Sequence, residues 1–417
     1  MTAHFPPFGE LHNFEYIDIM RILQINAVYG QGSTGTIVRD IEHLCFESGI
    51  ECYVASPDPK VREAKHGYVI GNTLDHKLHA LLSRIQGKQA YFSHIPTRNL
   101  IRWMEQIKPD IVHLHNLHSN YIHLNMLLDY LAKKDIITVV TMHDCWYYTG
   151  GCFHYANVDC YKWLKSCGNC PKNRSDQKSI LFDATSSILK DRRNFLLAIP
   201  RLHITGVSQW MAQEPLKSFL KDVPNYVIPN GIDLDVFKPA LSDFRKRLKL
   251  EDKYIILGPA SKWLDPVNAD VLAVFAKSMS SDEVLLLFGS KNMNIKVPEN
   301  VQLYGYTKDR KELSELYTAA DVFANCSRED SLSLINVESQ ACGTPVVTFD
   351  QTGPKETVDN KCSFSVSVGD GAALYDAVQR IKKINSEELS IMCQRFVRDR
   401  YDVKANYNKY INLYKSI

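Results

Sequence analysis

The feature that most constrains the fold is an alternation of short apolar runs with helical patterns. In the first half of the chain the strand-like runs are RILQINAV (residues 21–28), ECYVAS, DIVHLH, ITVVTMH, LHITGV and NYVIPN. Amphipathic patterns separate them, and we place helices over 36–47, 76–91, 97–107, 122–133 and 180–197. Apolar strands that alternate with helices predict a parallel sheet covered by helices on both faces.

A turn-rich segment, IPNGIDLDVFKPA (residues 228–240), interrupts the alternation, which then starts again. The second series of runs is YIILGPA, EVLLLFGS, VQLYGY, DVFANCS, TPVVTFD and SFSVSV, with helices expected over 267–279, 310–320, 334–341 and 372–384. A chain of 417 residues suits two domains. We therefore predict the α/β class, with two doubly wound, Rossmann-like domains that face each other across a ligand cleft.

Domain boundaries follow from the same pattern. Residues 1–19 show no periodicity and are expected to lie outside the core, with Met20 as an alternative start of the protein. The first domain is expected over 20–230 and the second over 231–395. Residues 396–417 are expected to form a helix that crosses back and braces the first domain.

Composition and charge narrow the class of protein. A net charge of +2 gives no argument for a nucleic-acid partner. No apolar run approaches the ~20 residues of a transmembrane helix, and the N-terminus lacks the basic flank and apolar core of a secretory signal. Eleven cysteines without such a signal argue against a disulfide framework. We expect a cytoplasmic protein whose contact with a membrane is at most peripheral.

A glycine-rich turn follows the first strand. The stretch VYGQGSTGTIVRDI contains G-x-G-x-x-G spacing that includes Gly32 and Gly35, and Ser33 or Thr34 could cap the next helix. Backbone N–H groups at such a turn favour a phosphate. A dinucleotide site and a turn that uses glycine only for its backbone freedom are the alternatives.

Two polar residues, His143 and Asp144, fall just after the carboxyl end of a strand in the stretch TVVTMHDCW (residues 138–146). Ligands of open α/β sheets bind at the carboxyl ends of the strands. An imidazole there can bond a phosphate or a sugar hydroxyl. The alternative is a buried histidine bonded to the backbone.

A cysteine-rich insert is expected over residues 145–171. Four of its cysteines have the spacing C-x7-C-x6-C-x2-C: Cys152, Cys160, Cys167 and Cys170. Four thiolates that end in a C-x2-C pair suit a tetrahedral structural zinc ion, and four protein ligands leave no open position for catalysis. Cys145 and His154 are alternative ligands, and unligated thiols are also compatible with the pattern. A nucleic-acid-binding zinc module is disfavoured because no basic stripe surrounds the cysteines.

The segment from Lys60 to Lys108 is basic, with nine Lys or Arg residues against three Asp or Glu residues. It includes the amphipathic stretch HKLHALLSRIQGKQAYF. Such a segment could face an anionic lipid-linked acceptor or a membrane surface. A solvated helix face is the alternative.

An acid pair, Asp330 and Glu338, follows the strand DVFANCS at a spacing of eight positions. The first acid is expected on a loop, and the second in the first turns of a helix that begins near Leu334. Carboxylates accept hydrogen bonds from vicinal hydroxyls, while loop N–H groups and the helix N-terminus favour phosphate. Sugar, phosphate and ribose together indicate a nucleotide-sugar. A glycosidase acid–base pair is the rival, although glycosidases need no twin doubly wound domains.

Taken together and in this order, VYGQGSTG, HDCW…TGGC…C-x6-C-x2-CP, PNGID…VFKP and D-x7-E…ACGTPVV…TGPKETV resemble the retaining glycosyltransferases of family 4. The resemblance is to the bacterial branch that includes colanic-acid and O-antigen transferases of the WcaC type. It implies a GT-B fold, a UDP- or GDP-sugar donor held mainly by the second domain, and an acceptor on the first. The implied acceptor is an oligosaccharide linked to polyprenyl diphosphate, with no cofactor for catalysis and no nucleic acid.

The resemblance also assigns roles to individual residues. Glu338 matches the acid expected to bind the donor ribose. Asp330 takes the place of the acid that holds donor-sugar hydroxyls, with Glu329 beside it to compensate for the shorter side chain. His143 matches the histidine at the reacting sugar, with Asp144 next to it.

Further positions complete the implied donor site. Gly32 and Gly35 match the glycine loop near the diphosphate, and Gly305 and Tyr306 match the loop beside the nucleobase. The residues between the two acids that are implied to contact the donor are Ser331, Leu332, Ser333 and Leu334.

One departure from the family concerns charge. The family has a basic pair that neutralises the diphosphate, where this chain has Pro266, Val267 and Asn268. The charge of the leaving group needs such compensation. Lys262 and Arg328 are the candidate substitutes. A catalytically degenerate nucleotide-sugar-binding protein and a GT-B-like sugar-nucleotide epimerase are therefore alternative functions.

Overall fold

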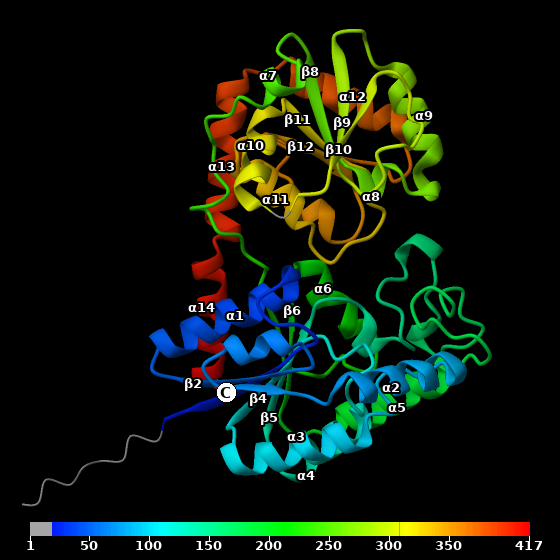
Figure 1. The fold of residues 1–417 in the computed structure, drawn as a ribbon, viewed down its shortest axis with the longest axis vertical. Helices are drawn as coiled ribbons and strands as arrows, with labels where there is room; N and C mark the ends of the chain where they lie inside the picture. Colours follow the sequence, from blue (N-terminus) through cyan, green and yellow to red (C-terminus); the bar gives the residue numbers. More distant parts are fainter. Residues whose placement is uncertain (1–18, 308) are drawn as a thin grey trace, which may run out of the picture.

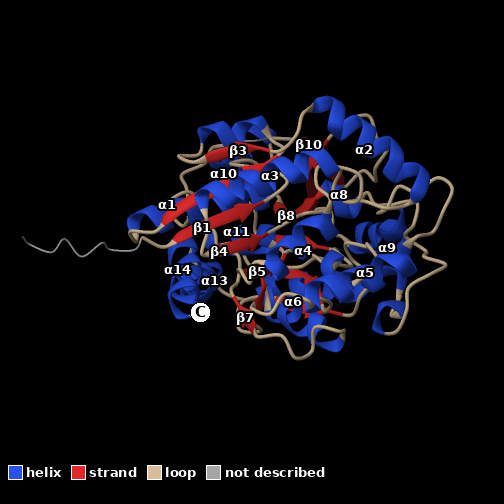
Figure 2. Ribbon diagram, turned by 90° about the horizontal axis from the view of Figure 1, so that it is seen from below, coloured by secondary structure: helices blue, strands red, loops and turns tan. Residues whose placement is uncertain are grey.

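The computed structural model describes residues 19–307 and 309–417 of the chain, which form two α/β domains joined by a narrow connection (Figure 1). All but the last residue of the predicted leader, 1–19, lies outside the described residues. In both domains the strands lie inside and the helices outside (Figure 2). Within the described residues, no helix combines the length and the apolar character needed to cross a bilayer.

The first domain contains a seven-stranded parallel sheet in the order β3-β2-β1-β4-β5-β6-β7. Its strands are β1 Arg21–Ile25, β2 Glu51–Ser56, β3 Gly67–Val69, β4 Ile111–Leu114, β5 Ile137–Met142, β6 Leu202–Gly206 and β7 Asn225–Val227. Its helices are α1 Gly32–Glu47, α2 Thr73–Gln86, α3 His94–Ile107, α4 Leu124–Lys133, α5 Thr185–Leu197 and α6 Gln209–Gln213. Strand β3 is only three residues long, and the sequence pattern did not predict it.

The second domain contains a six-stranded parallel sheet in the order β10-β9-β8-β11-β12-β13. Its strands are β8 Tyr254–Pro259, β9 Glu283–Ser290, β10 Val301–Gly305, β11 Val322–Asn325, β12 Val346–Phe349 and β13 Phe364–Val366. Its helices are α7 Phe244–Leu248, α8 Ala260–Trp263, α9 Ala269–Ser278, α10 Arg310–Ala319, α11 Leu334–Ala341, α12 Gly371–Lys382 and α13 Ser386–Tyr401. The two sheets confirm the predicted α/β class with two Rossmann-like domains.

Two segments of chain cross between the domains side by side. Ile232 donates its N–H to the carbonyl of Tyr401 at 2.8 Å, and Val403 donates to the carbonyl of Ile232 at 3.1 Å. A Cβ atom on Gly231 would lie 2.4 Å from the Cα of Val403, so this crossing requires glycine. The connection is therefore a paired hinge rather than a single flexible strand.

The last helix, α14 Val403–Ser416, packs on the first domain next to α1. Its buried aromatic residues share an apolar cluster with Ile37 and Ile41 of α1. Two of its hydroxyls bond to the sheet: Tyr414 to His113 of β4 at 2.6 Å, and Tyr410 to Thr141 of β5 at 3.1 Å. The C-terminus thus ties the second domain's chain to the core of the first.

The start of α1 differs from the prediction. The helix begins at Gly32, and its N-cap is Gln31 without a side-chain cap, so neither Ser33 nor Thr34 caps it. Gly32 has a φ of +64°, which favours glycine. Gly35 lies where a Cβ would approach the backbone of Tyr29 and Gly30 at 3.2 Å. The glycine pattern therefore serves both the turn and close packing of the helix.

Candidate active site

A cavity of about 430 Å³ lies between the two domains at the paired hinge. The first domain contributes the N-terminal turns of α1, including Gly32 and Arg39, and the second contributes Arg310, Leu334 and Glu338. The N-terminus of a helix carries a partial positive charge and Arg310 adds to it, whereas Arg39 pairs at 3.1 Å with Asp40, which also lines the cavity. The cavity therefore combines a positive region suited to phosphate with a carboxylate suited to hydroxyls.

Three carboxylates line this cavity, Asp40, Asp233 and Glu338, and α11 positions Glu338 in its second turn. Its Oε2 accepts a hydrogen bond from the hydroxyl of Tyr317 at 3.0 Å. Burial raises the pKa of Glu338 to about 7, while the Tyr317 bond and the charge of Arg310 act in the opposite direction. The group is therefore poised between its neutral and charged forms near neutral pH.

The loop between β11 and α11 reaches across to the first domain. Ser331 donates its hydroxyl to the backbone carbonyl of His143 at 2.5 Å. The backbone of Asp330 is held by Thr352 and Gly353, and its carboxylate forms no hydrogen bond or ion pair with the described residues. Asp330 thus keeps its carboxylate available beside the contact between the domains.

The hydrogen bonds around His143 determine which of its nitrogens carries the proton. Gln24 donates its amide to the carbonyl of Val38 at 3.0 Å, so its oxygen faces His115 Nε2 at 3.1 Å. His115 must then carry its proton on Nε2, which leaves its Nδ1 to accept from His143 Nε2 at 3.0 Å. His143 Nδ1 is consequently an unprotonated acceptor.

The same histidine is neutral near pH 7. Burial lowers the pKa of His143 to about 4. His115 lies deeper, fully buried, and burial also places its pKa well below the ordinary value. The side chain of His143 therefore offers a lone pair rather than a positive charge.

Asp144 lies next to His143 but is engaged by other groups. Its Oδ2 lies 3.3 Å from His118 Nε2, and its Oδ1 accepts the N–H of Trp146 at 2.8 Å. Burial opposes ionisation, but these two partners hold the pKa of Asp144 below its usual value. Its bonds connect it to the turn that begins the cysteine-rich insert.

Arg328 occupies the region where the family's basic pair was missing. Its Nε donates to Asn268 Oδ1 at 2.8 Å, and its Nη2 donates to the carbonyl of Val267 at 3.1 Å. Lys262 also lies near Cys326, the residue two positions before Arg328. Burial raises the pKa of Cys326 to about 12, and the positive charges of Lys262 and Arg328 are close enough to oppose that rise. Two positively charged side chains, Lys262 and Arg328, therefore lie close to Pro266–Asn268, the segment that lacks the family's basic pair.

The remaining predicted residues have different surroundings. Leu332 and Ser333 are buried, and the hydroxyl of Ser333 accepts from Asn325 at 3.0 Å, which indicates a role in shaping the loop. Gly305 ends β10, and Tyr306 after it is 62% exposed. Neither of the last two lines the 430 Å³ cavity.

Comparison with known proteins identifies the family. Residues 35–236 match Glycosyltransferase Family 4, and residues 246–383 match Glycosyl transferases group 1. The chain belongs to the family 4 glycosyltransferases. A relative in Escherichia coli (strain K12), named as the colanic acid biosynthesis glycosyl transferase WcaC, is 21% identical and covers 95% of this chain and 100% of its own.

Solved structures agree on the GT-B architecture of this glycosyltransferase. Sucrose-phosphate synthase from Thermosynechococcus elongatus superposes with a TM-score of 0.65 at 16% identity, over 95% of this chain and 98% of its own. The Anabaena protein Alr3699/HepE, solved with UDP-glucose, gives a TM-score of 0.62 at 15% identity, and the match covers 95% of this chain and 100% of the Anabaena chain. At these identities the likeness establishes the fold.

Glu329 of this glycosyltransferase does not compensate for the shorter Asp330, contrary to the expectation. Its carboxylate pairs with Lys172 at 2.7 Å and accepts the N–H of Asn157 at 2.9 Å. Both partners belong to the irregular segment that contains the cysteine-rich insert. Glu329 therefore joins the insert to the loop 326–333 between β11 and α11, which we call the donor loop because donor contacts are expected there, instead of facing a sugar.

The four cysteines with the zinc-like spacing surround one small cavity of about 20 Å³. Cys152, Cys160, Cys167 and Cys170 are all half-buried free thiols. Between Gly150 and Ala184 the chain forms two turns of 3-10 helix and no strand. Over residues 19–307 and 309–417, no group of three or more His, Cys, Asp or Glu side chains is already arranged to hold a metal ion. The composition of the cavity suits zinc, but the thiols would have to move closer together.

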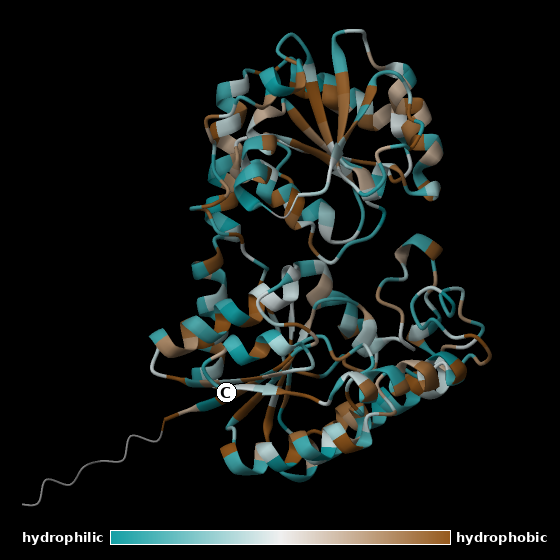
Figure 3. Ribbon diagram, viewed as in Figure 1, coloured by the Kyte–Doolittle hydropathy of each residue, from teal (hydrophilic) through white to brown (hydrophobic). Residues whose placement is uncertain are grey.

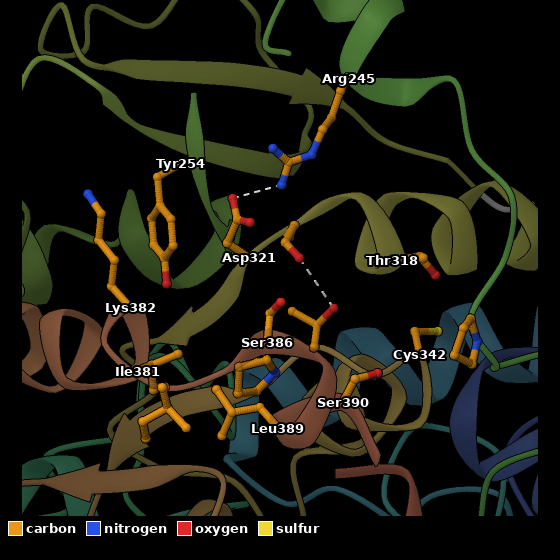
Figure 4. Close-up of a pocket in the computed structure, with 16 residues that line it drawn as sticks. Arg245, Tyr254, Thr318, Asp321, Cys342, Ile381, Lys382, Ser386, Leu389 and Ser390 are labelled. Atoms are coloured by element: carbon orange, nitrogen blue, oxygen red, sulfur yellow. Dashed lines mark hydrogen bonds and ion pairs between the residues drawn. The ribbon is translucent and has the colours of Figure 1, made fainter. Parts of the chain in front are cut away.

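A second cavity, of about 290 Å³, lies in the second domain (Figure 4). It is lined by Tyr254, Asp321 and Pro345, which stand at or just before the amino ends of β8, β11 and β12. Arg245 already neutralises Asp321 at 2.7 Å. Ligands of these sheets bind at the opposite, carboxyl ends, so the cavity between the domains is the better candidate for a ligand site.

Sequence reasoning missed several residues of the site. Arg310 and Arg39 line the cavity, and Lys172 holds the donor loop. Arg310 follows the GYT turn after β10 and was visible only as the first residue of a predicted helix. Gln24 and His115 lie on β1 and directly after β4, and only their contacts connect them to His143.

Proposed function

We propose that this chain is a retaining hexosyltransferase that moves a sugar from a UDP- or GDP-sugar to an oligosaccharide on polyprenyl diphosphate. The transfer would take place in the cytoplasm at the inner face of the plasma membrane. It would be a step in the synthesis of a surface polysaccharide such as O-antigen, capsule or exopolysaccharide. Family membership and the full-length likeness to WcaC support this proposal.

One observation carries the proposal: the cavity between the domains is lined by groups suited to a ribose and a diphosphate, while the groups considered for the transferred sugar and the leaving group lie outside this lining. Glu338 faces the cavity as the acceptor of ribose hydroxyls, and the N-terminal turns of α1 with Arg310 suit the diphosphate. Asp330 and the lone pair of His143 are available to hydroxyls of the transferred sugar. Arg328 and Lys262 are placed to compensate the charge of the leaving group.

The proposed reaction needs no metal ion in its chemical step. The bond between the anomeric carbon and the diphosphate oxygen breaks while the acceptor hydroxyl attacks from the same face. Its proton passes to the leaving diphosphate, whose negative charge Arg328 and Lys262 would stabilise. The protein contributes position and electrostatic stabilisation.

The donor-site assignment is tested with Glu338→Ala. A hydrogen bond to a charged group is worth about 1.5–3 kcal/mol, so we expect donor affinity to fall roughly ten- to hundredfold while the fold is kept. Thermal-shift titration of the purified protein with UDP- and GDP-sugars measures the loss, with the exposed Glu251→Ala as matched control. Unchanged stabilisation of Glu338→Ala by the donor would refute the assignment.

The raised pKa of Glu338 adds a pH signature. The ionised form accepts two hydrogen bonds from ribose, so donor affinity should rise as pH increases through about 7. Glu338→Gln should remove this dependence because it cannot ionise. A wild-type affinity that is flat between pH 6 and 8 would contradict the role of the carboxylate.

Two alternatives are separated by activity. A degenerate protein, suggested by the missing basic pair, would bind a nucleotide-sugar without hydrolysing or transferring it. A sugar-nucleotide epimerase would convert the donor without an acceptor. Release of nucleoside diphosphate that depends on an added acceptor distinguishes the transferase from both.

We also propose that the four cysteines around the small cavity bind one structural zinc ion. All four line the same space, and the segment around them has almost no regular secondary structure to stabilise it. Four thiolates drawn onto a single Zn²⁺ would supply that stability.

A further inference from the structure

Helix α2 has an unusual pattern: its two fully buried residues are polar, while three of its large apolar side chains are exposed. The buried residues are His79 and Ser83, and the three leucines Leu74, Leu78 and Leu81 are 77%, 59% and 55% exposed. The leucines follow the spacing i, i+4 and i+7, so they lie on one side of the helix. A surface helix of a globular protein normally turns this side to the core.

The buried side of α2 is fixed by specific hydrogen bonds. His79 Nδ1 bonds the hydroxyl of Ser93 at 2.6 Å, and its Nε2 accepts the N–H of Tyr91 at 3.3 Å. Ser83 donates to Asn120 Oδ1 at 2.8 Å. Rotation of the helix to bury its leucines would break all three bonds. The outward position of the leucines is therefore a property of the fold.

A second apolar segment extends this surface. Ile180, Leu181 and Phe182 are 66%, 66% and 59% exposed. Ile180 donates its N–H to the carbonyl of Arg84 in the last turn of α2 at 2.7 Å, so the segment lies beside the helix. We call the surface formed by both sets of residues the α2 face. Hydrophobic colour recurs along this helix at the edge of the first domain (Figure 3).

The charges around the α2 face are mainly unpaired cations. Lys77, Arg84 and Lys178 are exposed, and none of their side chains forms an ion pair with the described residues. The nearby acids are engaged by backbone N–H groups: Asp75 by Asn72 at 3.1 Å, and Asp183 by Cys170 at 2.7 Å. Apolar side chains flanked by free cations match the surface of an anionic bilayer.

The geometry points to the α2 face as the surface on which the first domain rests on an anionic lipid bilayer. Leucine and phenylalanine side chains would enter the boundary of the acyl chains, while Lys77, Arg84 and Lys178 would contact lipid phosphates. The inference deepens the proposed function, on which it rests for the lipid-linked acceptor. It also brings the acceptor domain, and the insert beside α2, to the membrane.

The test is co-flotation of the full-length protein with vesicles of phosphatidylcholine that contain the anionic lipid phosphatidylglycerol at about one third of the total. Wild type should float with these vesicles, less at high salt, and little with pure phosphatidylcholine. The triple variant Leu74→Gln, Leu78→Gln, Leu81→Gln should lose most binding. The double variant Lys77→Glu, Arg84→Glu should lose the preference for anionic lipid.

Two exposed apolar residues outside the α2 face serve as controls for the leucine variant. Leu241→Gln and Ile391→Gln replace exposed apolar residues of the second domain and should leave flotation unchanged. The inference is overturned if the triple variant floats like wild type, or if wild type is a dimer by light scattering that only the triple variant dissociates. It is also overturned if only a protein that begins at Met20 floats, because residues 1–19 would then be what covers the α2 face in the full-length protein. Donor thermal shifts in all variants report the proposed function separately.

Discussion

Two neighbouring residues of the donor loop, Arg328 and Glu329, bond to different domains. Arg328 turns back into its own domain and bonds the segment around Asn268, whereas Glu329 crosses to Lys172 and Asn157 of the first domain. The two charges are adjacent in the sequence, but each is compensated by a different part of the molecule. Asp330, the next residue, keeps its carboxylate available for a ligand.

At the same scale, Gln24 and His115 act on the site through His143. The bonds from Val38 through Gln24 and His115 make Nδ1 of His143 an acceptor. We predict that Gln24→Met allows His115 to change tautomer and gives a mixed population at His143. Two-dimensional ¹⁵N NMR of the histidine rings, in the absence of donor, measures this directly.

The rescue and control variants use the same chain of bonds. His115→Asn keeps an acceptor near His143 Nε2 and should preserve the tautomer, whereas His115→Leu should not. His113→Asn alters the neighbouring histidine, which bonds Tyr414 and Thr141, and should have no effect on His143. A wild-type His143 that is protonated on Nδ1 would contradict the proton positions inferred for Gln24, His115 and His143.

Elements differ in how much of their stability is local. The helices of both domains are supported by the sheets, but between Gly150 and Ala184 the backbone bonds form turns and two short 3-10 helices and no strand. Long segments without regular structure in compact domains need another source of order. The four thiols around one cavity offer it.

We predict that the purified protein contains close to one zinc ion per chain. Cys170→Ser should reduce the metal content by at least half and lower the melting temperature, and a chelator should do the same to wild type. Cys342→Ser, a buried cysteine of the second domain, should keep the zinc. Elemental analysis without stoichiometric zinc in wild type would reject the site.

The whole molecule is held closed by contacts that come from distant parts of the chain. Lys172 and Glu329 are both largely buried, with 12% and 14% of their side chains exposed. The N–H groups of Gln209 and Trp210 bond the carboxylate of Glu356, and burial raises the pKa of this carboxyl group. Together with the bond from Ser331 to His143, they join the domains around the cleft.

We predict that Lys172→Ala loosens this closure, because removal of one partner leaves the charge of Glu329 buried without compensation. Hydrogen exchange should increase both in the insert and in the loop 327–333, since the pair holds both. Lys165→Ala removes an exposed lysine of the same insert and should change neither. Faster exchange confined to the insert would contradict a role for the pair in holding the donor loop.

Much of the fold followed from the sequence because apolar periodicity records how one element is buried against its neighbours. The strands, both parallel sheets and the position of α11 were predictable in this way, whereas the family was predicted from the resemblance of several motifs in order. The three residues of β3 carry too little pattern to be recognised, and the start of α1 depends on a turn whose glycines also pack against its backbone. Even for α2 the helix was predicted, but the side that faces the core was not.

The site shows the same division. The sequence by itself predicted which residues carry the chemistry, because Glu338, Asp330 and His143 come after strand ends, where ligands of such sheets bind. Tertiary structure alone decided their partners, because Ser331 and His143 are 188 positions apart, and Arg328 and Asn268 are 60 apart. Local patterns reflect burial, whereas proton positions, charge compensation and the exposed leucines of α2 depend on contacts that no short stretch of sequence contains.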